Sequence, residues 1–461
     1  MGGLNLPAAC MGPMQRGASR GCFEFMKIGK ALLILILAAA LVAGVLRWRS
    51  FPHGPDRDAY WPEFRGPTQD GHSTAMGLPT EWGVDKNVVW KTALPGRSWS
   101  SPIVTGDRIF MTNATTANGG DDPHAAVTLH VLAVDAKDGK QLWDREIFTV
   151  EQPYTTGFHD KNSHASSTPV YDNGRVYAQF GNFGTACLDE AGKVLWKTTE
   201  PAFKTELGNG GCPIVVGDLL IFNCDGVEEP FVVALDKVTG KIRWKTMRGK
   251  PAQTRYALST PTVLKLKTGK DKEITEIITA GTRQVQALDP VDGHEIWHVF
   301  HDGYCNVPRP VIGCGLVFVT TGFENPHVLA IEPDPQGRAK GTHMVWDTDK
   351  HVPLTPSMLV VGEDLYMASD NGMVSCLEAK TGKVWWEERV GKATSASLLY
   401  ADGKIYLQDE FGKGYVFRPN HRLELLATND LQDKSMASYA VHRGRLLIRT
   451  QHALWCIGNK K

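Results

Sequence analysis

The sequence lacks an excess of charge of either sign. Its 461 residues include 50 Lys+Arg and 50 Asp+Glu, so the formal net charge is zero. Proteins that bind nucleic acids usually show a basic face or domain, and the balance therefore gives no reason to expect a nucleic-acid partner. The hydrophobic fraction of 42% is ordinary for a globular chain that buries a large core.

Familiar catalytic signatures are also missing. The sequence contains no G-x-S-x-G nucleophile elbow and no Walker A loop. His159 and His164 share a polar loop and could suggest a metal, but loop histidines more often only make hydrogen bonds. The loop at 119–124 lacks the spaced acidic ligands of a calcium cage. We therefore expect no metal site and assign no catalytic residue.

Long hydrophobic runs are limited to one, ALLILILAAALVAGVL at 31–46, which has basic residues on both sides. As a helix it would span about 24 Å, slightly less than a bilayer core of about 30 Å. We expect an uncleaved signal anchor, a transmembrane helix at 26–49; a cleaved signal peptide and a buried soluble helix are the alternatives. No cysteine lies directly after the run, which argues against a lipoprotein.

This anchor implies a layout for the whole chain. Residues 1–25 would form a disordered cytoplasmic leader, unless the true start is Met26, which opens the signal-like MKIGK. Because positive charge precedes the run, we expect a single-pass protein of the cytoplasmic membrane with its main domain on the periplasmic, or extracytoplasmic, side. Residues 50–86 would connect the anchor to that domain.

The sequence is rich in glycine and tryptophan, and both recur in one repeated unit. The unit is an apolar pair, an acid, a turn ending in Gly, and Trp four residues later. Clear copies are AVDAKDGKQLW at 133–143 and ALDKVTGKIRW at 234–244, and others lie at 187–196, 287–297, 330–346 and 376–386. Alternating apolar residues predict strands, and the acid with the following Gly predicts a tight turn.

A second periodic element precedes the first, as in SSPIVTGDRIFMT at 100–112, and joining the two gives four antiparallel strands, a propeller blade. Counting outer strands gives eight blades, the last a degenerate copy at Leu425–Leu426. The strand at 87–94 has no inner strands before it, and the strand at 453–457 has no outer strand after it. We therefore expect an all-β, eight-bladed propeller over 87–458, with a ring closed by its N-terminal strand. Seven tryptophans are expected as buried docking residues: Trp90, Trp143, Trp196, Trp244, Trp297, Trp346 and Trp386.

The repeat resembles the tryptophan-docking repeat of quinoprotein propellers and of the outer-membrane assembly factor BamB, over about residues 88 to 457. WPEFRGPTQDGHS at 61–73 is similar to the opening of a family of PQQ-like propellers in Planctomycetes and related bacteria. The resemblance to BamB implies a non-enzymatic binding or scaffold protein with a protein or peptide partner at or beyond the cell membrane.

Quinoprotein dehydrogenases of this fold hold pyrroloquinoline quinone (PQQ) with Ca²⁺, an adjacent-cysteine disulfide, a stacking Trp and a Glu, Asn and Asp set. This sequence has no adjacent cysteines and no matching set. The resemblance therefore implies the fold and not the cofactor, and we expect none. An oxidoreductase using PQQ or another cofactor remains one alternative, and a periplasmic carbohydrate-binding or sensor module is a second.

Loops at one face of a propeller converge on its central channel, so a binding site is expected there. The candidates are Arg97, Trp99, His159, His164, Arg255, Tyr256, Arg283, Asn306, Arg309 and Asp370. Several arginines and aromatics around one mouth suit an anionic ligand or a peptide, while hydrogen bonding between loops is the plainer alternative.

Seven of the nine cysteines follow the expected anchor. Cys212 and Cys224 lie on either side of a predicted hairpin with its turn near Gly217–Asp218. In an oxidising compartment we expect a disulfide between them, with buried free thiols as the alternative.

Overall fold

The computed structural model describes residues 57–459, except 118–124, 152–158, 206–207, 209, 228, 250–255, 269–271 and 335–343. The expected anchor at 26–49 lies outside these ranges. Among the described residues, no helix is long and apolar enough to cross a membrane. The regular secondary structure of the described residues is almost entirely strand, with two short 3-10 helices, η1 (Arg57–Ala59) and η2 (Gly181–Phe183).

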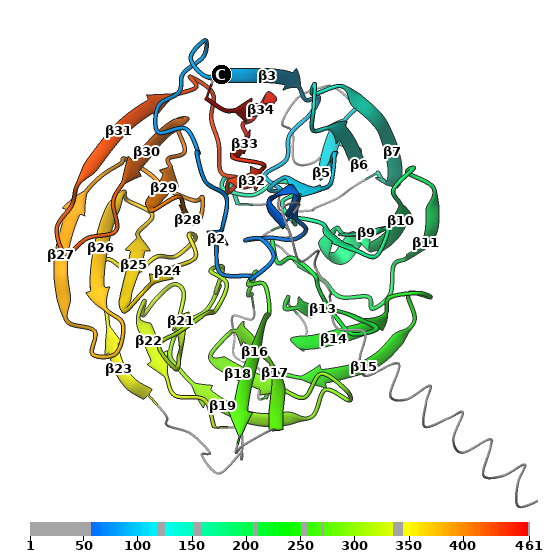
Figure 1. The fold of residues 1–461 in the computed structure, drawn as a ribbon. Coiled ribbons are helices and arrows are strands. Elements are labelled where there is room, and N and C mark those ends of the chain that lie inside the picture. Colours follow the sequence, from blue (N-terminus) through cyan, green and yellow to red (C-terminus); the bar gives the residue numbers. More distant parts are fainter. Residues whose placement is uncertain are drawn as a thin grey trace, which may run out of the picture. The chain divides into compact units, whose positions relative to one another are not determined.

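The described strands form eight antiparallel sheets arranged around a central axis, an eight-bladed propeller (Figure 1). Blades 1 and 2 contain β4 (Ile103–Thr105), β5 (Arg108–Thr116), β6 (Val127–Asp135), β7 (Gln141–Val150), β8 (Val170–Asp172), β9 (Arg175–Gln179), β10 (Thr185–Asp189) and β11 (Val194–Thr198). Blades 3 and 4 contain β12 (Ile214–Val216), β13 (Leu219–Cys224), β14 (Phe231–Asp236), β15 (Ile242–Met247), β16 (Thr262–Thr268), β17 (Lys272–Gly281), β18 (Gln284–Leu288) and β19 (Glu295–Phe300).

The second half of the ring repeats the same plan. Blades 5 and 6 contain β20 (Val311–Gly313), β21 (Leu316–Thr320), β22 (Val328–Ile331), β23 (Met344–Thr348), β24 (Leu359–Val361), β25 (Asp364–Ala368), β26 (Met373–Glu378) and β27 (Val384–Arg389). Blades 7 and 8 contain β28 (Leu399–Ala401), β29 (Lys404–Gln408), β30 (Lys413–Phe417), β31 (Leu425–Asp430), β32 (Ala440–His442), β33 (Arg445–Arg449), β34 (Ala453–Ile457) and, from the other end of the chain, β3 (Val88–Ala93).

The last blade is completed by the N-terminal strand, as the sequence predicted. β3 pairs with β34 in antiparallel register, with Lys91 opposite Trp455 and Ala93 opposite Ala453. Figure 1 shows β3, in blue, as the outer strand beside the red strands β32 to β34. The blade count of eight is therefore confirmed, including the degenerate outer strand β31.

The hydrophobic core lies between neighbouring blades. Consecutive residues of a strand point to opposite faces of its sheet. On β5, Met111 packs in the cluster shared by blades 8 and 1, and Phe110 packs in the cluster shared by blades 1 and 2. Each blade therefore buries both faces, which explains why the inner strands read as continuous apolar runs.

The repeated tryptophans connect each blade to the next. Trp196 of β11 donates its indole N–H to the carbonyl of Lys237 in blade 3, at 3.2 Å. Its ring lies where a Cβ on Gly240 would be, 2.7 Å from the nearest ring atom, and Gly240 has φ +73°. The repeat therefore needs glycine in the turn for both the left-handed backbone and the space that the tryptophan fills.

Five other tryptophans donate to a carbonyl of the following blade: Trp90 to Ala136, Trp143 to Glu190, Trp244 to Pro290, Trp346 to Ala379 and Trp386 to Asn420. Trp297 differs, because its indole donates to the carboxylate of Glu276 within its own blade, at 2.8 Å. The turn of blade 5 that would receive Trp297 overlaps residues 335–343, outside the described residues.

Candidate functional site

The segment that precedes the propeller repeats enters the central channel from one face. We call residues 60–73 the plug. Its strand β1 (Tyr60–Trp61) pairs with β4 of blade 1, and its strand β2 (His72–Ser73) pairs in parallel with β28 of blade 7. Figure 1 shows this blue segment in the middle of the ring. The plug therefore joins blades on both sides of the axis.

Buried charged groups hold the plug in place. Arg65 donates to the carbonyls of Ser357, at 3.1 Å, and Met358, at 2.6 Å, in blade 6. Arg309, which precedes β20 of blade 5 and is fully buried, donates to the carbonyl of Phe64 at 2.7 Å. Burial lowers the pKa of both arginines to about 9, and both remain charged at neutral pH. The backbone of the plug is thus bound by blades distant in sequence.

Above the plug lies a cavity of about 150 Å³ with Phe64 at its floor. Two tiers of side chains from the segments before the inner strands line it. The lower tier, which we call the girdle, comprises Ser101, Thr168, Cys212, Thr260, Ser357, Ser397 and Ser438. The upper tier, two residues earlier in each blade, comprises Trp99, Ser166, Gly210, Leu258, Val307, Thr355, Ser395 and Met436. Spacing by two directs both residues of an extended segment to the same side, here the axis.

The girdle is a chain of hydrogen bonds that runs from blade to blade. The backbone N–H of Ser101 donates to the hydroxyl of Thr168 at 2.9 Å, and the N–H of Thr168 donates to the Cys212 thiol at 3.2 Å. Equivalent bonds of 2.9–3.0 Å continue from Cys212 to Thr260, from Ser357 to Ser397, from Ser397 to Ser438 and from Ser438 to Ser101. Blade 5 supplies Arg309 at this position, and its side chain contacts the plug instead.

The side of the cavity away from the plug is partly covered by residues 159–162, between blades 1 and 2. Lys161 forms ion pairs with Asp370 at 3.0 Å and Glu410 at 2.9 Å, which belong to blades 6 and 7. The two carboxylates are held by hydroxyls of the upper tier, Thr355 and Ser395. These contacts fix Lys161 over the channel and raise its pKa against the opposing effect of desolvation.

The structure brings four of the predicted site residues to this mouth. Trp99 and His159 line the cavity, and Asp370 holds Lys161. Arg97 lies over the Trp99 ring, 5.5 Å from its centroid, and donates to the carbonyl of Asp160 at 2.9 Å.

The other predicted residues lie elsewhere or serve the scaffold. Arg309 is bound to the plug and is not exposed at the mouth, because its position is the girdle position of blade 5. Asn306 is fully buried and donates to the carbonyl of Thr320. His164 is buried and Tyr256 half-buried, and neither lines the cavity; Arg283 is exposed on the loop between β17 and β18. Arg255 lies outside the described residues.

Sequence reasoning missed the girdle and the plug contacts. A signal for the girdle exists: a hydroxyl residue or cysteine precedes Pro in blades 1 to 4, at Ser101, Thr168, Cys212 and Thr260. Blade 5 breaks the pattern with Arg309 before Pro310. A pattern break of this kind marks a residue with a different partner.

The predicted disulfide between Cys212 and Cys224 is wrong for this structure, in which both are free thiols. The hairpin β12–β13 pairs Ile214 with Ile221, a register that sets position 212 opposite Asn223, not Cys224. A shift of one residue turns the side chain to the other face of the sheet. Cys212 accordingly faces the channel, and Cys224 packs with apolar residues between blades 2 and 3.

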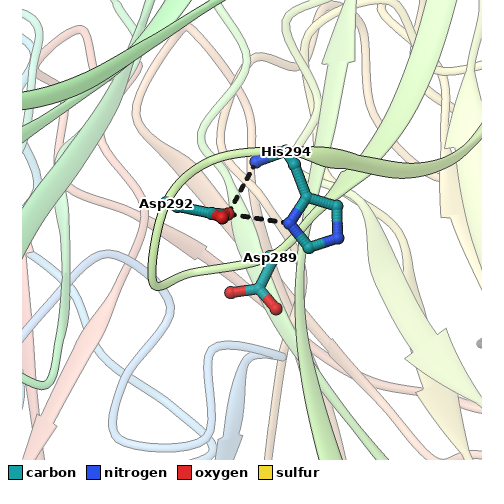
Figure 2. A group of neighbouring side chains, drawn as sticks. All are labelled: Asp289, Asp292 and His294. Atoms are coloured by element: carbon teal, nitrogen blue, oxygen red, sulfur yellow. Dashed lines mark hydrogen bonds and ion pairs between the residues drawn. The ribbon is translucent and has the colours of Figure 1, made fainter.

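The pentapeptide HEIWH at 294–298 matches the H-E-x-x-H pattern of zinc hydrolases, a match that the expectation of no metal site wrongly overlooked. That pattern chelates zinc from a helix, where residues four apart share a face within one turn. Here Glu295–Phe300 is strand β19, so four residues span about 13 Å and His294 and His298 cannot reach one ion. Neighbouring Asp289 and Asp292 form a cluster with His294 (Figure 2).

Turn chemistry accounts for this cluster. Asp289 accepts the N–H of Val291 at 2.7 Å, and Asp292 accepts both the N–H and the ring nitrogen of His294 (Figure 2). Asp138 makes the same bond to the N–H of Lys140 in blade 1. The arrangement is that of the repeat's exposed turn, and we assign no metal to it.

The residues around the axis do not fit PQQ with its Ca²⁺. Phe64 of the plug closes the channel below the cavity. The two cysteines that line it, Cys212 and Cys305, are free and far apart in sequence. The charges of Lys161, Asp370 and Glu410 are already paired with one another. We therefore derive no chemical step through this cofactor.

With this geometry established, comparison with known proteins places the chain. The family described as "Outer membrane protein assembly factor BamB" matches residues 77–153, 127–299, 184–338 and 337–447. The chain is 21% identical over 306 residues to the outer membrane protein assembly factor BamB of Yersinia pestis, covering 64% of this chain and 73% of that protein. It is 23% identical over 302 residues to BamB of Shewanella oneidensis, covering 61% and 71%.

Among solved structures, the crystal structure of BamB from Moraxella catarrhalis is similar with a TM-score of 0.53 and 13% identity. That similarity covers 80% of this chain and 99% of the other, and at this identity it bears on the fold alone. The fold and the repeat pattern therefore agree with the family match.

Proposed function

The chain belongs to the BamB family of β-propellers, and from this premise we propose that it is a non-enzymatic scaffold that binds a protein partner through one propeller face. The observation that carries the proposal is the asymmetry of the two faces. The chain's own plug fills the channel from one side, which we call the plug face. The opposite side, the cavity face, carries the cavity and residues 159–162, which partly cover it.

We further propose that the cavity face is directed away from a membrane. The described chain enters the propeller at the plug face, where Asp58 and Ala59 of η1 accept the backbone N–H groups of Arg443 and Gly106. These two residues belong to the turns β32–β33 and β4–β5. An anchor at 26–49 would precede the plug in the sequence, and we propose that the cavity face is free for partners on the extracytoplasmic side.

Site-directed photo-crosslinking in membranes tests the choice of face. The full chain carries a photoreactive residue in place of Arg283, exposed on the cavity face, or in place of Arg443, on the plug face. We expect one discrete protein adduct from position 283 and none of the same size from position 443. Equal adducts from both positions, or no adduct together with turnover of an alcohol or sugar by the purified chain, would contradict the proposal.

A variant in the residues that cover the cavity, 159–162, makes the crosslinking experiment more specific. Lys161→Glu replaces the two ion pairs with three neighbouring carboxylates and should displace residues 159–162. We expect it to reduce the adduct at position 283 at least several-fold. Lys86→Glu, on an exposed residue far from the cavity face, is the matched charge control and should leave the adduct unchanged.

A further inference from the structure

The axial cavity presents hydrogen-bond donors that the protein does not use. Six girdle hydroxyls each accept a backbone N–H from the blade before: those of Ser101, Thr168, Thr260, Ser357, Ser397 and Ser438. Within the described part of the chain, the hydroxyls of Ser101, Ser357, Ser397 and Ser438 donate to no protein acceptor, whereas those of Thr168 and Thr260 also form hydrogen bonds with the Cys212 thiol. Because a hydroxyl that accepts one bond still carries an O–H, these four serines, on the neighbouring blades 6, 7, 8 and 1, offer an arc of donors at the level of the cavity floor.

Trp99 adds a donor in the upper tier. Its side chain lines the cavity and is only 6% exposed, and its indole N–H is buried without a hydrogen-bond partner. An indole nitrogen can donate but cannot accept. Buried donors are nearly always paired in native proteins, so this one points to an acceptor atom on a ligand.

Buried charge around the girdle favours an anionic acceptor. Arg65 and Arg309 lie below the girdle, where Glu63 is 3.8 Å from Arg309 and the Asp70 side chain is near Arg65. Arg449 is fully buried behind Ser101; its described partners are carbonyls, the Ser100 hydroxyl and the Asn113 side chain. Three positively charged guanidinium groups thus lie near the girdle with two carboxylates. This excess of positive charge gives a positive potential at the lower end of the cavity.

The walls above the girdle are apolar over part of their circumference. Leu258, Val307 and Met436 occupy upper-tier positions, and Phe323 lies near them. The hydroxyl residues of that tier are engaged: Thr355 and Ser395 donate to the carboxylates that hold Lys161, and Ser166 donates to the side chain of Asn162. A cavity of about 150 Å³ accepts a group the size of benzene.

We propose that the cavity binds a small organic carboxylate with an apolar body. The carboxylate lies against the girdle hydroxyls, and the body packs between Trp99, Leu258 and Val307. The same chemistry is found in a free organic acid and in the C-terminal residue of a polypeptide. Binding of a polypeptide C-terminus rests on the proposed scaffold function, whereas binding of a free organic acid is independent of it.

Calorimetric titration of the full chain tests the proposal with matched probes. Phenylacetate supplies the carboxylate and an aromatic body, and phenylacetamide is its neutral counterpart of the same shape. We expect phenylacetate to bind at least about tenfold more tightly than phenylacetamide. Equal affinities, or no binding of any carboxylate probe, would overturn the proposal, and neither result would affect the face-specific crosslinking described above.

A peptide arm distinguishes the two sources. A hexapeptide ending in Phe is titrated as the free acid and as the C-terminal amide. Tighter binding of the acid than of both its amide and phenylacetate assigns the cavity to a chain end. Binding of phenylacetate that matches or exceeds the peptide acid assigns it to a free organic acid.

Girdle variants remove donors without removing acceptors. Cys212 shows that a thiol at this position still accepts the N–H of the preceding blade, so Ser397→Cys with Ser438→Cys should keep the fold while losing two strong O–H donors. We expect phenylacetate affinity to fall about fivefold or more with the melting temperature nearly unchanged. Ser73→Cys is the control, because Ser73 likewise accepts a backbone N–H, from Ala75, but lies outside the cavity. The proposal would be contradicted by an unchanged phenylacetate affinity in the girdle variant, or by an equal loss of affinity in the control.

Discussion

The contact between blades 2 and 3 and the contact between blades 7 and 8 join similar sheets in different ways. At the first, Trp196 packs on the turn glycine Gly240 and donates to the carbonyl of Lys237. At the second, β31 carries Ala427 at the docking position, opposite Val416 as Trp244 is opposite Ala234, and blade 8 has no turn between its third and fourth strands. That junction consists of the end of β34 and the start of β3.

Another tryptophan stabilises the contact at the closing blade. Trp82, from the segment before β3, is 3% exposed and packs near Tyr406 of blade 7 and Tyr439 of blade 8. Its backbone N–H donates to the side chain of Asn429 at 2.7 Å. The comparison teaches that a docking tryptophan requires a continuous turn to receive it. Where the chain is interrupted, the N-terminal segment supplies an aromatic side chain from elsewhere.

The largest expected effect is at a continuous contact. Trp244→Ala removes an 8%-exposed side chain that donates to the carbonyl of Pro290 in blade 4. We expect the free energy of unfolding to fall by about 3–5 kcal/mol, measured by denaturant titration. Trp244→Phe, which keeps most of the apolar surface, should cost clearly less. Equal losses would mean that packing contributes little at this contact.

The closing contact should respond almost as strongly to a residue outside the repeats. We expect Trp82→Ala to lower the free energy of unfolding by about 3 kcal/mol. Hydrogen exchange should increase first in β31 and β32, since Trp82 packs against the blades that contain them. Met76→Ala, at a 71%-exposed side chain of the same segment, serves as control. A near-zero effect of Trp82→Ala would break the comparison.

Acid should loosen the closing blade relative to blade 3. His442 of blade 8 donates from Nε2 to the carbonyl of Gly106 in blade 1, and burial lowers its pKa below the usual 6.5. The unfolded state therefore binds this proton more readily, so the contribution is complete above about pH 6.5 and is lost as pH falls through the lowered pKa. Buried Asp225 of blade 3 has a pKa raised to about 6 by desolvation, and its protonation acts in the opposite direction.

Hydrogen exchange between pH 7 and pH 5 checks this difference. We expect protection of β32 and β33, relative to blade 3, to fall as the pH is lowered, and His442→Gln to reduce the pH dependence. A uniform loss of protection around the ring would contradict the assignment to His442.

The smallest expected effect is from adding a tryptophan. Ala427 is half-buried at the docking position of β31, and the adjoining blade offers no turn glycine at this junction. We expect Ala427→Trp to raise the free energy of unfolding by no more than about 0.5 kcal/mol. A gain of 2 kcal/mol or more would show that docking does not require a turn.

The ring itself was predictable because its signals are local and repeated. The spacing from acid to Gly to Trp fixed the blades, and unmatched strands at 87–94 and 453–457 predicted the pairing of β3 with β34. The plug was not predictable, since residues 60–73 show no alternation and Arg65 bonds to Ser357 and Met358, far along the chain. The error at Cys212 and Cys224 was one of register by a single residue, which composition and spacing do not settle.

The pairing of β3 with β34 also has a consequence for biosynthesis. Val88 pairs with Ile457, so the first strand of the propeller to leave the ribosome pairs with the last. Contacts of such high sequence separation form late and slowly, and until then both strands expose free edges. A chain that stops short of β34 cannot complete its final blade. The ring can therefore close only after the whole propeller has been synthesised.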